Sequence, residues 1–432
     1  MAAAMARQRF DRLADWLSWQ EKLHPSAIDL GLDRLWRTLE RLQWRRPACP
    51  VLTVGGTNGK GSCVALLSRI LAEAGYRVGT FTSPHLVRYN ERIRIDGREI
   101  SDASLVAAFE RIDEARGADT LTFFEFNTLA ALLAFETAGL DAIVLEVGMG
   151  GRLDAVNAVD ADVAIVTSIG IDHCEWLGAD RETIGREKAG IFRAGRPAVF
   201  GSRDMPESIA QCARELGADL QQLGQQFDWS RNGECWTWRG RDRSYQDLPV
   251  PALEGEFQLD NASAVLAALE AVSTRLPVDR ADIERGLENV RLPGRFQVIS
   301  EATPTRLDWV LDVAHNPAAA SALASQLGAR SIEGRTLAVC GILSDKDIEG
   351  ITAAIRGMID EWIVVGLDSP RALKPEALAE RLRRAGLTVV AVEPNVASGC
   401  RVARSLAREG DRIVVFGSFL CVGPALELLS PG

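Results

Sequence analysis

Glycines, a lysine and a serine follow a short apolar run near residue 50 of the chain. The run is Val51–Val54, and the polar segment after it is Gly55–Ser62. Glycines let successive backbone N–H groups turn toward phosphate oxygens, a following helix directs its positive end at them, and a lysine adds a mobile charge. Val54 stands where the common P-loop has its first glycine, and Gly61 separates the lysine from the serine, so this is a variant loop. The segment predicts nucleotide binding, with a purely structural strand-to-helix turn as the alternative.

Three polar side chains are expected just past the ends of buried strands. Glu146 ends the apolar run Ala142–Leu145, and an acid there usually holds a nucleotide's metal ion. Ser83 can offer its hydroxyl to magnesium or belong to a simple Ser-Pro turn. His173 follows the buried run Asp162–Ile169 and is a candidate metal or phosphate ligand, although a lone histidine is more often structural.

Other residues carry less specific signals. Phe123 and Phe124 open a helical stretch and can either pack in the core or stack on a flat ligand. The segment Ile28–Leu32 is typical of a helix-loop-helix connection. By composition alone, Lys188 on a charged helix is a surface lysine.

Composition excludes several classes of protein. The 432 residues include 49 Lys+Arg and 59 Asp+Glu, giving a net charge of −10, and no basic cluster indicates a nucleic-acid partner. No apolar run approaches the roughly 18 residues that cross a membrane, and Met1–Phe10 lacks the apolar core of a signal peptide. A cytoplasmic protein with two domains is expected. Eight cysteines without a C-x-x-C pair are expected to be reduced and buried.

Strands and helices alternate through the first part of the chain. A helical stretch is expected over Phe10–Leu39, interrupted at His24-Pro25. Further strands are expected at Tyr76–Thr82, Ala142–Glu146, Asp162–Ile169 and Pro197–Phe200. Helices are expected at Cys63–Ala74, Asn127–Thr137 and Asn261–Val272. Beyond Phe227, alternating residues around Asn232-Gly233 predict an antiparallel hairpin.

A domain boundary is expected at Leu292–Gln297. Five buried strands follow, at Trp309–Val313, Thr336–Ile342, Trp362–Leu367, Thr388–Val392 and Arg412–Phe416. Polar clusters follow three of them, at Asp312–Pro317, Ser344–Asp347 and Gly417–Phe419. The predicted fold class is α/β: a large P-loop-type domain (1–296) with a mainly parallel sheet and a small antiparallel hairpin, then a smaller Rossmann-like α/β domain (297–432).

Several motifs, in one order, resemble the folylpolyglutamate synthases, and more closely the bacterial bifunctional dihydrofolate synthase/folylpolyglutamate synthases. The motifs cover both domains and are Gly56–Ser62, Thr82–Leu86, Phe124-Glu125, Leu145–Ala155, Asp172-His173, Glu187–Gly190, Leu292–Arg295 and Asp312–Pro317. The displaced P-loop spacing is shared with the related Mur ligases.

The resemblance implies ATP-dependent amide formation between a pteroate or folate carboxylate and the amine of L-glutamate. An acyl phosphate would form first, and ADP and phosphate would be released. The implied cofactors are ATP and Mg²⁺, with two magnesium ions expected and K⁺ as a further candidate. The implied partners are small molecules (dihydropteroate, reduced folates, L-glutamate and ATP), with no nucleic acid or membrane, and the protein is expected to be a monomer. The implied division is ATP and pterin binding in 1–296 and the glutamate side in 297–432.

The resemblance also implies roles for individual residues. The residues that it implies for nucleotide binding are Thr57, Asn58, Gly59, Lys60, Gly61, Ser62, Asn261, Arg295 and Asp312. Ser83, Glu146 and His173 are implied to bind magnesium. His315 and Ser418 are implied for the glutamate side. Dihydropteroate falls to Asp29, Leu30, Gly31, Leu32, Thr122, Phe123, Phe124, Glu125, Leu153, Asp154 and Ala155. Lys188 matches an N-carboxylated lysine, and Lys60, Lys188 and His173 are the catalytic candidates. Cys174 departs from the more polar neighbour expected after His173.

Three rival functions remain at this stage. A folylpolyglutamate synthase without the first activity would carry the same motifs. Another Mur-type ligase would be expected to place a UDP-sugar domain before the phosphate loop, where only about fifty residues stand. A nucleotide-dependent switch could use the same loop, but Ser344–Asp347 lacks the asparagine of a guanine-reading motif, and a switch would not need the polar strand ends of the second domain.

Overall fold

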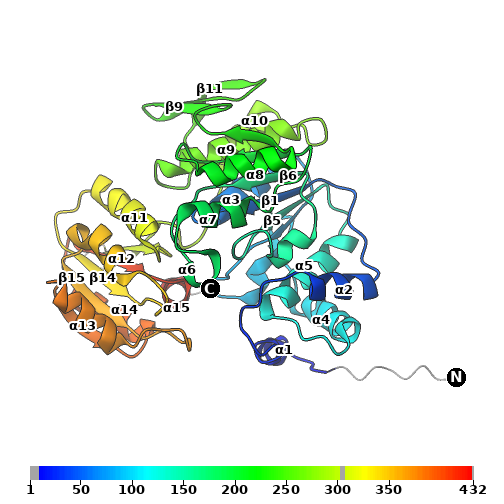
Figure 1. The fold of residues 1–432 in the computed structure, drawn as a ribbon. Coiled ribbons are helices and arrows are strands. Elements are labelled where there is room, and N and C mark those ends of the chain that lie inside the picture. The colour runs from blue at the N-terminus through cyan, green and yellow to red at the C-terminus, as the bar shows by residue number, and fades with distance from the viewer. Residues whose placement is uncertain (1–8, 302–306, 431–432) are drawn as a thin grey trace. The chain divides into compact units, whose positions relative to one another are not determined.

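The computed structural model describes residues 9–301 and 307–430 (Figure 1). Within them the chain forms two compact units. The larger unit comprises residues up to 83, 90–250 and 260–290, and the smaller one comprises 84–89, 251–259 and the residues from 291 on. Most of Met1–Phe10 lies outside the described residues. Among the helices of the described part, none combines the length and apolarity that a membrane span requires.

An eight-stranded sheet forms the centre of the larger unit. Its order is β4-β3-β2-β5-β1-β6-β7-β8, and all neighbours from β2 to β8 are parallel, whereas β3 and β4 form an antiparallel edge. The strands are β1 Val51–Gly55, β2 Val78–Phe81, β3 Ile93–Ile95, β4 Arg98–Glu99, β5 Ala142–Glu146, β6 Val163–Val166, β7 Pro197–Phe200 and β8 Asp219–Gln222. Val54 of β1 pairs with Glu146 and Ile165, so β1, β5 and β6 end at one edge.

Helices cover this sheet, which explains why its central strands β1, β5 and β6 are buried at every position. They are α1 Leu13–Gln20, α2 Asp33–Arg41, α3 Lys60–Glu73, α4 Asp102–Arg116, α5 Phe123–Thr137, α6 Cys174–Leu177, α7 Arg181–Ala189, α8 Glu207–Leu216, α9 Phe257–Ala271 and α10 Arg280–Asn289. One face of β6 and β7 packs on α7 and α8 in a single apolar cluster, where Ala198 and Phe200 are buried with Ile184 and Ile209.

The predicted hairpin is confirmed and gains a third strand. β9 Asp228–Asn232, β10 Cys235–Arg239 and β11 Ser244–Pro249 form an antiparallel sheet in the order β11-β10-β9. Gly233 adopts a φ of 62° in the turn, as the Asn-Gly signal requires. Trp236 and Trp238 point to one face and are fully buried, which anchors the small sheet.

A six-stranded sheet forms the smaller unit, in the order β12-β13-β17-β14-β15-β16. All pairs are parallel except β12 with β13. The elements are β12 Gln297–Glu301, β13 Leu307–Asp312, β14 Thr336–Cys340, β15 Glu361–Val365, β16 Val389–Glu393, β17 Arg412–Phe416, α11 Pro317–Ala329, α12 Ile348–Ile355, α13 Pro375–Arg384, α14 Val396–Leu406 and α15 Phe419–Leu429.

Successive residues of these strands enter two different apolar clusters. Ala338 and Cys340 of β14 pack in one cluster with α11, α12 and α13. Leu337 and Val339 pack in the other with α14 and α15. Helices therefore cover both faces of the sheet, and the expected α/β class with a second, Rossmann-like unit is confirmed.

Several expectations were wrong in detail. The stretch Phe10–Leu39 is helical on both sides of His24-Pro25 as expected, but the interruption spans residues 21–32 and is longer than predicted. Helix α3 begins at Lys60, not Cys63. Gly59 supplies the left-handed N-cap that allows the earlier start. All eight cysteines are free thiols, but only Cys63, Cys340, Cys400 and Cys421 are buried, and Cys174 is exposed.

Candidate active site

The phosphate loop is shaped by two glycines in the left-handed half of backbone space. Gly56 has a φ of 134°, and a Cβ there would lie 1.9 Å from Thr167 Oγ1. Gly59 has a φ of 90°, and a Cβ there would lie 2.4 Å from Asn261 Oδ1. Only glycine fits either place. The structure thus brings Asn261, from a distant helix, against the loop.

The segment after β6 forms several hydrogen bonds with the phosphate loop. Thr57 N donates to Ser168 O at 2.8 Å, and Thr167 Oγ1 donates to Asn58 O at 2.6 Å. The Thr57 hydroxyl donates to Gly170 O and accepts from Gly170 N. Sequence reasoning gave Thr167 and Ser168 no role, because their partners lie more than a hundred residues away.

Two lysines approach one carbonyl of this loop. Lys60 Nζ donates to Gly56 O and Thr57 O, both at 3.1 Å, and Lys188 Nζ donates to Gly56 O at 3.0 Å. Lys188 is only 5% exposed, so reading it as a surface lysine was wrong. Burial, and secondarily the charge of Lys60, lowers the pKa of Lys188 to about 7.

Lys188 is held in place by the loop that follows Glu146. A Cβ on Gly151 would lie 2.7 Å from Glu187 O and 2.8 Å from Lys188 O. Arg152 N donates to Glu187 O at 2.9 Å, and Asn157 Nδ2 donates to both Arg152 O and Gly190 O. The end of α7 therefore lies directly against this glycine-containing loop.

Two of the three candidate magnesium ligands meet at the sheet edge. Ser83 N donates to Glu146 Oε2 at 3.2 Å, since β2 and β5 are neighbouring parallel strands. His173 stands in the left-handed conformation at the start of α6, with its Nε2 3.9 Å from Asp172 Oδ2.

These side chains fit Mg²⁺ in a particular way. Glu146 is buried at a strand end and offers carboxylate oxygen, the donor type that magnesium prefers. Within residues 9–301 and 307–430, no group of three or more His, Cys, Asp and Glu side chains is placed to hold a metal together. Mg²⁺ commonly uses one or two carboxylates and completes its shell with phosphates and water. A carboxylate of this kind, with phosphates and water completing the shell, would suit a nucleotide-borne ion.

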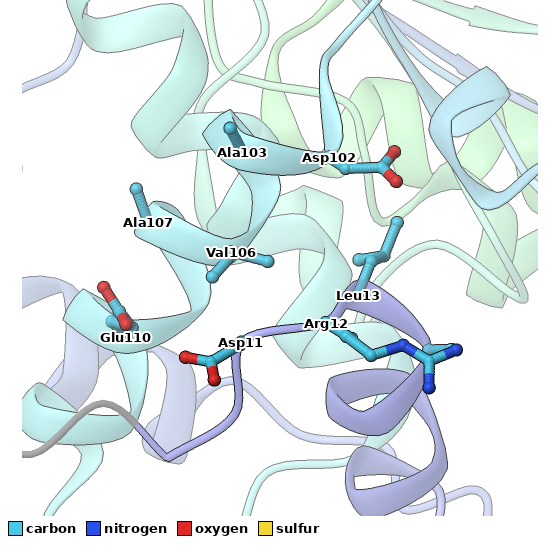
Figure 2. Close-up of a pocket in the computed structure, with 9 residues that line it drawn as sticks. Asp11, Arg12, Leu13, Asp102, Ala103, Val106, Ala107 and Glu110 are labelled. Atoms are coloured by element: carbon cyan, nitrogen blue, oxygen red, sulfur yellow. The ribbon is translucent and has the colours of Figure 1, made fainter.

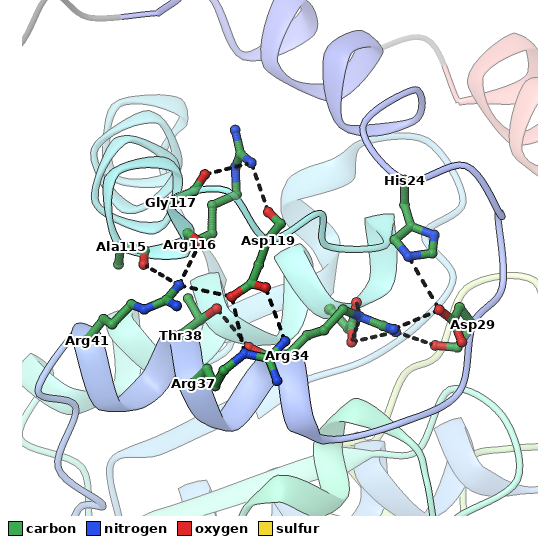
Figure 3. A network of polar contacts seen from close by, with 11 residues as sticks. His24, Asp29, Arg34, Arg37, Thr38, Arg41, Ala115, Arg116, Gly117 and Asp119 are labelled. Atoms are coloured by element: carbon green, nitrogen blue, oxygen red, sulfur yellow. Dashed lines mark hydrogen bonds and ion pairs between the residues drawn. The ribbon is translucent and has the colours of Figure 1, made fainter.

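The structure joins the first two segments implied for dihydropteroate through a residue that the sequence did not single out. Arg34 Nη1 lies 2.7 Å from Asp29 Oδ2, and Arg34 Nη2 lies 3.1 Å from Glu125 Oε1 (Figure 3). Thr122 caps α5 in a capping box with Glu125, a pattern readable as Thr-x-x-Glu. Nothing in the sequence near Arg34 indicates a partner 91 residues away.

The loop between Glu146 and the third implied segment contacts the second segment through the ring of Phe124. A Cβ on Gly148 would lie 2.5 Å from Phe124 Cζ, so the loop after Glu146 packs on that ring. Asp154 is buried, and its carboxylate accepts from Met149 N at 2.9 Å and Val156 N at 3.0 Å. Burial raises the pKa of Asp154 to about 6, although these backbone donors oppose the rise. The side chain thus shapes its own loop, whatever it contributes to a ligand.

The candidate residues of the smaller unit gather around β13 and α15. Asp312 accepts from Phe296 N and Ala314 N at 2.8 Å, and burial raises its pKa. Ser418 caps α15 by accepting from Leu420 N. The guanidinium of Arg295 lies 5.1 Å from the Phe419 ring centroid, and the His315 ring lies 6.3 Å from it. Phe419, which had no assigned role, therefore contacts two of the predicted residues.

A surface pocket of about 660 Å³ lies between the start of α1 and α4 (Figure 2). Among the residues that the structure describes, its lining includes Asp11, Asp102 and Glu110 but only one guanidinium, that of Arg12. None of its residues is a predicted site residue. The excess of carboxylates makes it unsuited to an anionic nucleotide or carboxylate substrate.

Two protein families match the chain. The Mur ligase middle domain matches residues 54–269, from the phosphate loop through α9. The Mur ligase glutamate ligase domain matches residues 294–419. Together they cover most of the three sheets and every candidate residue except Asp29–Leu32.

Individual proteins match over almost the whole chain. The dihydrofolate synthase/folylpolyglutamate synthase of Escherichia coli (strain K12) is 44% identical over 417 residues, covering 96% of this chain and 95% of that protein. The protein of the same name from Haemophilus influenzae is 42% identical, covering 94% and 95%.

Solved structures agree. E. coli FolC in complex with DHPP and ADP has a TM-score of 0.90 and 45% identity, covering 96% of this chain and 97% of that one. A bifunctional folylpolyglutamate synthase/dihydrofolate synthase with Mn, AMPPNP and L-glutamate bound has a TM-score of 0.89 and 46% identity, covering 98% and 99%. The chain belongs to the dihydrofolate synthase/folylpolyglutamate synthase family of the Mur ligases.

Proposed function

We propose that this protein is an ATP-dependent ligase that joins L-glutamate to dihydropteroate, forming dihydrofolate, and to folates, forming folylpolyglutamates. The observation that carries the proposal is the phosphate loop, where Lys60 and Lys188 converge on Gly56 O beside Asn261. Identity above 40% over nearly the full length to proteins named for both activities supports this assignment over a ligase with another acceptor.

The nucleotide is assigned to residues of both matched domains. Thr57–Ser62 would hold the phosphates through backbone N–H groups and the Lys60 ammonium. Asn261 lies against the loop, and Arg295 and Asp312 are assigned to the rest of the nucleotide. Residues 1–296 are proposed to bind ATP and the pterin, and residues 297–432 to serve glutamate, with His315 and Ser418 on that side.

Magnesium is assigned to Ser83, Glu146 and His173, with two ions and K⁺ as the proposed complement. When bound, such an ion neutralises phosphate charge during phosphoryl transfer. Lys188 is proposed to carry an N-carboxyl group, because a buried amine with a pKa of about 7 is substantially neutral and nucleophilic near neutral pH. Carboxylation would replace a cation beside Lys60 with an anion that Lys60 can pair.

The proposed reaction has two steps. A carboxylate oxygen of the acceptor attacks the γ-phosphorus of ATP, and the bond to ADP breaks to give an acyl phosphate. The neutral amine of glutamate then attacks the acyl carbon, phosphate leaves with the shared oxygen, and the amine proton passes to solvent. Lys60 offsets the repulsion between the two anions in the first step. Exclusion of water protects the acyl phosphate.

The remaining assignments concern setting and assembly. Eight free thiols suit a reducing compartment, so we place the enzyme in the cytoplasm. We propose that it acts as a monomer on small molecules.

The proposal is tested with purified protein, ATP, MgCl2 and L-glutamate, given either dihydropteroate or tetrahydrofolate. The expected result is phosphate release that requires both glutamate and an acceptor, with a product one glutamyl residue heavier by mass spectrometry. Activity with tetrahydrofolate alone would reduce the function to folylpolyglutamate synthesis. Phosphate release that needs no acceptor and yields no product would favour a nucleotide-dependent switch.

A further inference from the structure

Arg34 is the centre of a polar network that ties a loop to the start of a helix. Its Nη1 donates to Asp29 Oδ2 at 2.7 Å and its Nη2 donates to Asp29 O at 2.8 Å. On its other side, its Nε donates to Glu125 Oε1 at 3.2 Å. His24 Nε2 lies 3.3 Å from Asp29 Oδ2 and braces the loop from the far side. One guanidinium thus fixes both the side chain and the backbone of Asp29 relative to Glu125.

Glu125 also forms hydrogen bonds at the start of α5. Its Oε2 accepts from Thr122 N at 2.8 Å, and its own N–H donates to Thr122 Oγ1 at 3.2 Å. The carboxylate is nearly buried, with 4% of the side chain exposed. A buried carboxylate needs a partner of opposite charge, and the fork of Arg34 provides it. Any displacement of Arg34 would therefore also disturb the α5 terminus that carries Phe124.

The residues of this network differ in their exposure, and their charges do not balance. The Asp29 side chain is 42% exposed, whereas Arg34 is 21% exposed. Two carboxylates face one guanidinium, so the network carries a net negative charge. A planar heterocycle rich in N–H donors, such as a pterin, matches such a surface.

We propose that Arg34 is a positioning residue for the acceptor: it holds Asp29–Leu32 against Thr122–Glu125 so that the two segments present one preformed surface to the pterin. The inference rests on the proposed function, because it takes these two segments as the dihydropteroate-binding ones. Arg34 acts through Asp29 and Glu125 and needs no contact with the substrate. Without Arg34, the two segments are no longer held in a fixed arrangement. Part of the binding free energy of dihydropteroate is then used to order them, so dihydropteroate binds more weakly.

Arg37 provides a matched control one turn along the same helix. Its Nε and Nη2 lie 3.2 and 3.1 Å from the two carboxylate oxygens of Asp119, so it also makes a forked arginine–carboxylate pair (Figure 3). Both residues of that pair lie outside the two proposed segments. Arg37→Gln therefore reports the cost of losing such a pair from α2 without any effect on the acceptor surface.

The test compares Arg34→Gln with Arg37→Gln in steady-state kinetics and in direct dihydropteroate binding without ATP. Arg34→Gln is expected to raise KM and Kd for dihydropteroate about tenfold or more, the scale of a lost charge-assisted hydrogen bond, with KM for ATP and kcat within about twofold. Arg37→Gln is expected to leave all of these unchanged. A merely structural role would lower the melting temperature or the active fraction and leave KM for dihydropteroate unmoved, which would overturn the proposal.

Two more variants keep the test decisive if Arg34→Gln folds poorly. Arg34→Lys keeps the charge but loses the fork, so it should raise the same KM by a smaller factor. Asp29→Asn, in a half-exposed side chain, should raise it too, and the double variant Asp29→Asn/Arg34→Gln should show less than the product of the single effects. Multiplicative effects would overturn the coupling. If the wild-type enzyme fails to ligate dihydropteroate at all, the proposed function fails instead, which the wild-type assay alone reveals.

Discussion

Lys60 and Lys188 donate to the same acceptor, the carbonyl oxygen of Gly56, at 3.1 and 3.0 Å. Two ammonium groups this close repel each other, and the buried one pays the larger desolvation cost. The pKa of Lys188 is accordingly lowered to about 7, by burial first and by Lys60 second. Nearby Asp172 and Asp154 only partly oppose this fall. The lowered pKa lets Lys188 lose its proton near neutral pH, which an ordinary surface lysine does not do.

Replacing Lys60 should abolish turnover without unfolding the protein. The ammonium group donates to two loop carbonyls, Gly56 O and Thr57 O, and a lysine in a phosphate loop contributes little apolar packing. We expect Lys60→Ala to lower kcat/KM for ATP by about a hundredfold or more, as for removal of one electrostatic stabiliser. Circular dichroism and the melting temperature should stay near wild type. Near-normal ligation by the folded variant would remove the phosphate loop from the mechanism.

Lys188 should accept CO2 in a pH-dependent manner. Only the neutral amine forms a carbamate, and with a pKa near 7 its neutral fraction rises as pH increases through that value. At fixed dissolved ¹³CO2, a carbamate signal in ¹³C NMR should therefore increase from about pH 6 to about pH 8, the interval around this pKa. The control Lys188→Ala should lack the signal, lose activity and partly recover with a small added carboxylic acid. Fully active enzyme with an unmodified lysine would contradict the assignment.

The contact between Gly151 and α7 should tolerate no side chain. A methyl group there would meet backbone atoms of Glu187 and Lys188 at 2.7 to 3.0 Å, and backbone cannot move away cheaply. We expect Gly151→Ala to destabilise the fold by about 1–3 kcal/mol, typical of overpacking, and to displace Lys188. Gly357→Ala is the matched control, because nothing lies within 4 Å of a Cβ at that position. Equal melting temperatures for the two variants would show that the loop and α7 are not held together.

Asp154 should affect the two activities unequally. Its carboxylate accepts from Met149 N and Val156 N, so Asp154→Ala should loosen the loop and lower both activities. Dihydropteroate lacks a glutamate tail and must be bound largely through its pterin. Losing a charged acceptor should therefore weaken its binding by roughly a further 1.5–3 kcal/mol. The ratio of kcat/KM for dihydropteroate to that for tetrahydrofolate should then fall about tenfold or more. An unchanged ratio would leave Asp154 with the loop-shaping role alone.

The sequence revealed strands best where both faces are buried. β7 was predicted to the residue, because Pro197–Phe200 is a short apolar run between turns. Edge strands β8 and β12 were missed, since Asp219–Gln222 and Gln297–Glu301 are polar and only partly buried. Neither segment shows a continuous apolar run or a regular apolar/polar alternation, so neither carries a strand signal.

The candidate site was predictable only where motifs carry it. The burial of Lys188 was not, because a lysine on a charged helix resembles any surface lysine until Gly151 is seen packed on its backbone. Thr167 escaped because its hydroxyl supports a loop 109 residues earlier in the chain. Long-range hydrogen bonds of this kind leave no local pattern. The sequence therefore pointed to the groups expected to react but not to the residues that hold them.

Oxygen transfer from the acceptor tests the central claim most directly. Dihydropteroate labelled with ¹⁸O in both carboxylate oxygens is incubated with the enzyme, ATP and L-glutamate, and the released phosphate and the dihydrofolate are analysed by mass spectrometry. Formation of an acyl phosphate predicts one labelled oxygen in each phosphate released and one retained in the new amide. Unlabelled phosphate, released while dihydrofolate forms, would contradict the account.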